Sequence, residues 1–144
     1  MKKIVFSLII IAFFSVSSIY AKTASKDVPK EIETELQKLQ SPQSNLVIDG
    51  AKKVREHPLQ KYYSIPAVID ALQGVQFEGQ LMVTRAGGAS KKSVIEELVA
   101  TLKYLTGQDF GEDHDKWKNY WEKNAEHYKL TLGNFDSSVP TLIK

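Results

Sequence analysis

The chain has 144 residues, with 19 basic against 17 acidic side chains and no cysteine. This length suits one domain with a modest core, and without cysteine that core must be stabilised by apolar burial, not by disulfides. A charge balance this close to neutral lacks the basic surface of a nucleic-acid-binding protein, so we exclude that class of partner.

Residues 1–21 have the three parts of a secretory signal peptide. Two lysines precede an apolar run from Ile4 to Phe14, and small polar residues then lead to Ala21. The run is shorter than the roughly 20 residues that a spanning helix needs. We therefore expect cleavage after Ala21, no stable membrane insertion afterwards, and a mature protein in the periplasm or outside the cell. An uncleaved anchor is the alternative, because Ile19 is larger than the small residue usual at its position.

After a polar lead-in at 22–28, apolar residues recur at helical spacing. A first helix is predicted from Pro29 to Leu39. Ser41, as N-cap, and Pro42 predict the start of a second helix that ends at His57–Pro58. Its apolar positions are Leu46, Val47, Ala51 and Val54.

A third helix is predicted from about Ser64, with Pro66 tolerated in its first turn, to Gly74. Residues 75–92 fit a helix or a strand poorly because they contain glycines. We predict a short helix within them, at 80–85. Ser93 and Glu96 match a capping box, which predicts a further helix ending at Gly107.

Three apolar triads share the spacing i, i+4, i+7 and follow one another at intervals of 33 residues. They are Ile32-Leu36-Leu39, Ile65-Ile69-Leu72 and Leu98-Leu102-Leu105. A repeat of this length is typical of α-solenoids, in which helix pairs stack because one pair cannot bury its apolar face alone. Coincidence is the alternative, since any amphipathic helix offers this spacing.

Two segments resemble a known family. Residues 64–72, with their Ile-Pro-x-Val-Ile-x-x-Leu pattern, are similar to the second helix of a HEAT repeat, and Ala51 to Val54 resemble the core of the first helix. The stretch Leu105 to Trp121 resembles the closing block of exported bacterial HEAT-repeat domains, which often reads Leu-Thr-Gly-x-x-Phe-Gly-x-Asp-x-x-x-Trp-x-x-Trp. Within this stretch we single out Asp109, Phe110, Gly111, Asp113, Trp117 and Trp121 as motif or capping residues. The resemblance covers residues 41–125 at most and implies a protein-binding or scaffolding surface without catalytic residues.

An acidic cluster lies between the predicted helix that ends at Gly107 and Trp117: Asp109, Glu112, Asp113, His114 and Asp115. A metal site is one interpretation, but the spacing fits neither an EF-hand loop nor a zinc site. We favour the alternative, that Asp113 or Asp115 caps the next helix, and we predict no metal and no cofactor.

Aromatic residues form one helical stripe after this cluster: Trp117, Tyr120, Trp121 and Tyr128, with Asn124 among them. The stripe is either a platform for sugars or a proline-rich peptide, or the face of a closing helix that covers the last exposed pair, with Phe110 beneath it. We favour the closing helix and expect Tyr120 or Tyr128 to reach solvent.

A basic group, Lys52, Lys53 and Arg55 with Lys61, Lys91 and Lys92, is either an ordinary charged surface or a ridge for an acidic partner. No nucleophile elbow or phosphate-binding loop is present in the sequence, so we predict no enzyme. The resulting prediction is an all-α, HEAT-like stack over 29–130 with an irregular tail at 131–144, whose function is to bind another protein. A small-ligand or glycan binder that uses Trp117, Tyr120 and Trp121 is the alternative.

Overall fold

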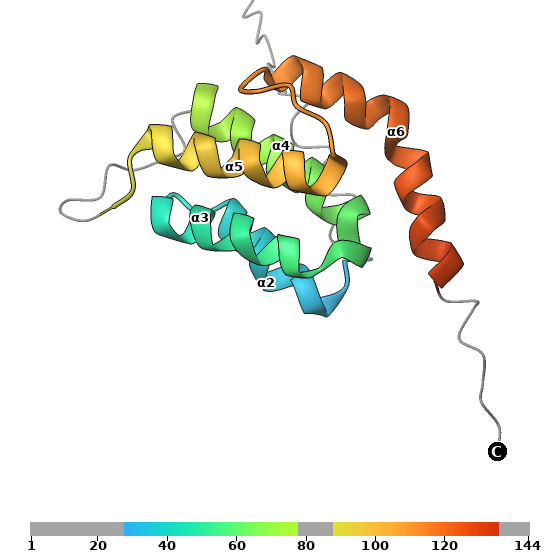
Figure 1. Cartoon of the computed structure of the whole chain (residues 1–144). Coiled ribbons are helices and arrows are strands. Elements are labelled where there is room, and N and C mark those ends of the chain that lie inside the picture. Colours follow the sequence, from blue (N-terminus) through green and yellow to red (C-terminus); the bar gives the residue numbers. More distant parts are fainter. Residues whose placement is uncertain (1–27, 78–87, 136–144) are drawn as a thin grey trace, which may run out of the picture.

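A computed structural model describes residues 28–77 and 88–135 of the chain. Within these ranges the protein is all-helical, as predicted, with five α-helices packed together, two short 3-10 helices and no strand (Figure 1). The predicted signal peptide, nearly all of the lead-in, the predicted helix around 80–85 and residues 136–144 lie outside the described ranges. None of the helices in the described part is long and apolar enough to cross a membrane.

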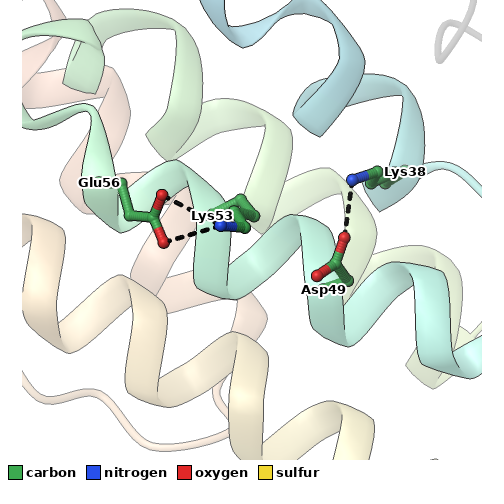
Figure 2. A network of polar contacts seen from close by, with 4 residues as sticks. All are labelled: Lys38, Asp49, Lys53 and Glu56. Carbon is green, nitrogen blue, oxygen red and sulfur yellow. Dashed lines mark hydrogen bonds and ion pairs between the residues drawn. The ribbon is translucent and has the colours of Figure 1, made fainter.

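The first two helices, α2 (Lys30–Leu39) and α3 (Ser44–Lys53), form a hairpin. They approach closely at Gly50, where a Cβ atom would lie 2.8 Å from the Glu35 carbonyl oxygen. An ion pair of 2.7 Å joins Lys38 of α2 to Asp49 of α3 (Figure 2). The predicted start of α3 at Ser41 and Pro42 is wrong. Ser41 instead accepts a hydrogen bond from the Gln43 amide at 3.1 Å, a local turn that delays the helix to Ser44.

Two single-turn 3-10 helices, η1 (Val54–Glu56) and η2 (Pro58–Gln60), lead into α4 (Lys61–Phe77). α4 is longer than predicted at both ends. It begins three residues before Ser64, whose hydroxyl donates to the Gln60 carbonyl at 3.1 Å. It also continues past Gly74, which is buried, because tertiary packing overrides the low helix propensity of one glycine.

The next helix, α5 (Lys91–Thr106), begins at a different serine from the one predicted. Ser90 is the N-cap, and its hydroxyl accepts a hydrogen bond from the Ser93 amide at 3.1 Å. Ser93 therefore lies inside the helix, and the predicted capping box with Glu96 does not form. The predicted end at Gly107 is confirmed, since this glycine adopts φ 72°.

The last helix, α6 (His114–Phe135), begins after a turn that contains Gly111. Asp113 caps it, because its carboxylate accepts from the Lys116 amide at 3.1 Å and its carbonyl from the Trp117 amide at 3.2 Å. Of the two predicted caps, Asp113 and Asp115, Asp113 is therefore the one that forms these bonds. The helix runs to Phe135, so the first five residues of the tail predicted at 131–144 are helical.

The core lies between the helices and contains the repeated apolar stripes. Eight of the nine triad residues are buried, and Leu36 is partly buried and packed against the core. α4 is central, since it contacts α2, α5 and α6, and α3 packs along α5 (Figure 1). Leu46, predicted as an apolar position of α3, is instead 37% exposed.

Candidate interaction surfaces

The predicted basic group is largely tied into the fold. Arg55 of η1 reaches across to α5, where its Nε donates to the Thr101 hydroxyl at 2.9 Å and its guanidinium pairs with Glu97. Thr101 is fully buried and donates to the Ala51 carbonyl at 3.0 Å. Burial lowers the pKa of Arg55, and nearby Tyr104 offsets part of that effect. Arg55 thus links the end of α3 to α5 and is not a free cation for a partner.

The lysines of this group differ in what they contact. Lys53 pairs with Glu56 at 3.1 Å (Figure 2). Lys91 donates to the Gln76 carbonyl at 3.1 Å, and Lys92 lies 3.8 Å from Glu96. Lys52, in the last turn of α3, is exposed. Lys53, Lys91 and Lys92 therefore each have a partner within the fold, and exposed Lys52 is our candidate to meet another molecule.

Sequence reasoning missed Tyr104, which is 60% exposed on α5 close to Arg55. A tyrosine between Lys103 and the buried Leu105 falls off the apolar stripe of its helix, and this mismatch was the signal that could have identified it. Large exposed aromatic side chains are enriched where proteins bind one another. Tyr104 lies close to Arg55, and Lys52 is exposed in the last turn of α3. We call these three residues the α3–α5 face.

The residues of the predicted closing block organise the turn before α6. Trp117 is fully buried, and its indole N–H donates to the Gly111 carbonyl at 2.8 Å. Phe110 packs edge-on against Trp117, with ring centroids 4.8 Å apart. Asp109 accepts from the Gly111 amide at 3.0 Å and pairs with Lys103 at 2.8 Å. Asp109, Phe110, Gly111 and Trp117 therefore each make a structural contact in this turn.

Several members of the predicted acidic cluster bind separate partners. The side chains of Asp109 and Asp113 bind Lys103 and Lys116, and the Glu112 carbonyl accepts from Gln76. The hydrogen bond from Lys103 lowers the pKa of Asp109, and that from the Lys116 amide lowers the pKa of Asp113. Within the described ranges, no group of three or more His, Asp or Glu side chains is arranged to hold a metal ion.

The other aromatic residues of α6 form a connected cluster with the start of α4. Trp121 lies 5.7 Å from Tyr62 and stacks on Tyr128 at 5.8 Å, measured between ring centroids. The hydroxyls of Tyr120 and Tyr128 are 2.9 Å apart. Burial, and then this hydrogen bond, raises the pKa of Tyr128. Tyr120, Trp121 and Tyr128 are each half-buried.

Comparisons with protein-family models, with curated proteins and with solved structures found no match to this chain. The alternative interpretation, a sugar platform, cannot include Trp117, since this side chain is fully buried and cannot stack on an external ligand.

Proposed function

We propose that the mature chain is an exported, non-catalytic module that binds another protein, and that its helices form a short HEAT-like stack. The observation that carries this proposal is the pattern of helix contacts. α2 lies against α4 and α4 against α6, while α3 lies against α5. Two rows of this kind are expected when successive hairpins stack in a solenoid, and the long open face of such a row serves recognition more readily than chemistry.

The use of the polar side chains supports the non-catalytic part of this proposal. Arg55, Glu97 and Thr101 bridge η1 and α5, and the acidic residues near α6 cap a helix or bind lysines. Catalysis would require an acid, base or nucleophile held in a cleft with a shifted pKa suited to its task. These residues serve structural contacts instead.

The α3–α5 face is the surface that we assign to the partner. It includes an exposed cation at Lys52 and an exposed aromatic ring at Tyr104, and Tyr104 lies close to Arg55, which pairs with Glu97. Because that pair fixes η1 against α5, the two exposed side chains are displayed on a rigid base. A partner that fits this face combines an acidic group with an apolar one.

Site-specific photo-cross-linking in intact cells tests the proposal. A photoreactive amino acid at Lys52 or Tyr104 is expected to give one heterologous adduct, whereas the same group at exposed Glu33 of α2 gives none. The recovered chain should begin at Lys22, which N-terminal sequencing measures. Equal labelling at all three positions, or no adduct at any of them, contradicts the proposal.

A further inference from the structure

Tyr120 and Tyr128 of α6 bring their phenol hydroxyls into direct contact. The two oxygen atoms lie 2.9 Å apart, although the residues are eight positions apart in the helix. Eight residues cover about 12 Å of helix at 1.5 Å per residue, so the side chains must lean along the helix axis to meet. The contact therefore depends on how the two rings are held, and not on sequence spacing alone.

Neighbouring aromatic rings hold both phenols in this position. Tyr128 stacks on Trp121 with ring centroids 5.8 Å apart, and Tyr120 lies 5.8 Å from Phe110. Trp121 in turn contacts Tyr62 of α4 at 5.7 Å. Burial, and then the hydrogen bond between the two hydroxyls, raises the pKa of Tyr128, which keeps this phenol neutral. The pair is thus fixed by packing, while each ring is only partly buried and keeps some contact with solvent.

A hydroxyl contact of this kind resembles the arrangement in dityrosine, in which two tyrosine rings are joined through the carbons next to their hydroxyls. In that product the two hydroxyls flank the new bond and lie within hydrogen-bond distance of each other. The folded chain already holds the hydroxyls of Tyr120 and Tyr128 in this relation. Tyr104, by contrast, is 60% exposed on another helix, so coupling at that residue would join two molecules.

We propose that Tyr120 and Tyr128 are a site of oxidative cross-linking, at which a one-electron oxidant joins the two rings as an intramolecular dityrosine. Each phenol loses one electron and its hydroxyl proton, and the two phenoxyl radicals form one carbon–carbon bond between the carbons next to their oxygens. The hydrogens on those carbons then move to the oxygens, which restores both phenols. When a peroxidase supplies the oxidant, the two electrons and two protons that are released reduce one hydrogen peroxide to two waters.

Such a link gives a covalent restraint to a chain that has no cysteine. Small proteins in oxidising compartments commonly gain this restraint from disulfides, which this chain cannot form. A bond between Tyr120 and Tyr128 closes a ring over two turns of α6 and retains the stacking of Tyr128 on Trp121. The link uses no residue of the α3–α5 face, so its test does not depend on the proposed function.

Oxidation of the mature full chain by a peroxidase and hydrogen peroxide tests the proposal. Trypsin cleaves after lysine, so the monomer is expected to release residues 119–123 joined to residues 124–129, lighter by two hydrogen atoms than the separate peptides. Tyr128→Phe is expected to lower the dityrosine fluorescence of the monomer about tenfold, because the partner ring is no longer held at a high effective concentration. Tyr104→Phe, the matched control, leaves that fluorescence unchanged. Fluorescence that persists in Tyr128→Phe, or links found only between two molecules, overturns the proposal.

A second measurement separates the folded geometry from closeness in sequence and uses the natural chain, so it does not depend on whether a variant folds. A photochemical one-electron oxidant is applied to the folded chain and to the chain unfolded in urea, where the two rings meet only by random encounter. The yield of the intramolecular link is expected to be about tenfold higher in the folded chain, because its hydroxyls are already in contact. Equal yields in the two conditions refute the cross-linking site.

Discussion

Replacing Gly50 by alanine tests whether the close approach of α2 and α3 is as tight as the structure indicates. A Cβ atom at this position would lie 2.8 Å from the Glu35 carbonyl oxygen, 2.9 Å from the Lys38 Cβ and 3.2 Å from the Leu39 amide nitrogen. Two of these atoms belong to the backbone of α2, so they cannot move away by changing a rotamer. The helices must separate to admit the methyl group.

The two effects of this substitution have opposite signs. Alanine favours the helix by about 1 kcal/mol over glycine, whereas overpacking a close contact costs about 1–3 kcal/mol. Because the contacts are with backbone, we take the upper part of that range and expect a net loss of about 1–2 kcal/mol. For a domain of this size that lowers the melting temperature by about 5–15 °C.

Thermal unfolding followed by circular dichroism measures the change. Ala100→Gly, at an exposed position in α5, is the calibration variant, and it should lose about 1 kcal/mol through helix propensity alone. A Gly50→Ala protein that melts higher than the natural one would refute the close approach of α2 and α3.

Three further predictions follow from buried or coupled side chains. Trp117→Ala should cost about 3–5 kcal/mol in urea unfolding, because the indole is fully buried, and Trp121→Ala less than half as much; equal losses would contradict the difference in burial. Arg55→Met should cost about 1–3 kcal/mol by leaving Glu97 unpaired, and a double-mutant cycle with Glu97→Gln should show coupling, whereas simple additivity would mean that the pair contributes nothing. Because the folded-state pKa of Tyr128 is raised, its contribution to stability is complete below pH 10 and is lost as the pH rises further; Tyr128→Phe should weaken this alkaline loss, and an unchanged pH profile would argue against it.

The sequence located the helical stripes well because burial of one face imposes the helical period on the apolar residues. The three triads are in the core, and the helix end at Gly107 is where the glycine predicted it. Helix starts were less accurate. At Ser41 and Ser93 a residue with the right side chain was present, but a neighbouring turn or another serine took the expected role. Several residues near one helix start can accept the same backbone hydrogen bonds, so local sequence does not choose between them.

The candidate interaction surface also combines features that local sequence predicts with features that only the packing determines. The sequence grouped Lys52, Lys53 and Arg55 as one basic surface, yet η1 turns Arg55 toward Glu97 and Thr101, more than 40 positions further along the chain. That partnership depends on how α3 packs on α5, and no local pattern encodes it. Tyr104 became a candidate only when its exposure beside Arg55 was known.

For this protein, the sequence by itself determined the all-helical class, the apolar stripes and an acidic cap at Asp113 or Asp115, because each depends on residues within a few positions of one another. Only the tertiary structure decided the order of helix contacts, the burial of Trp117 and the pairing of Arg55 with Glu97. Those features depend on which helix faces meet in space, and this is set by the packing of the whole core.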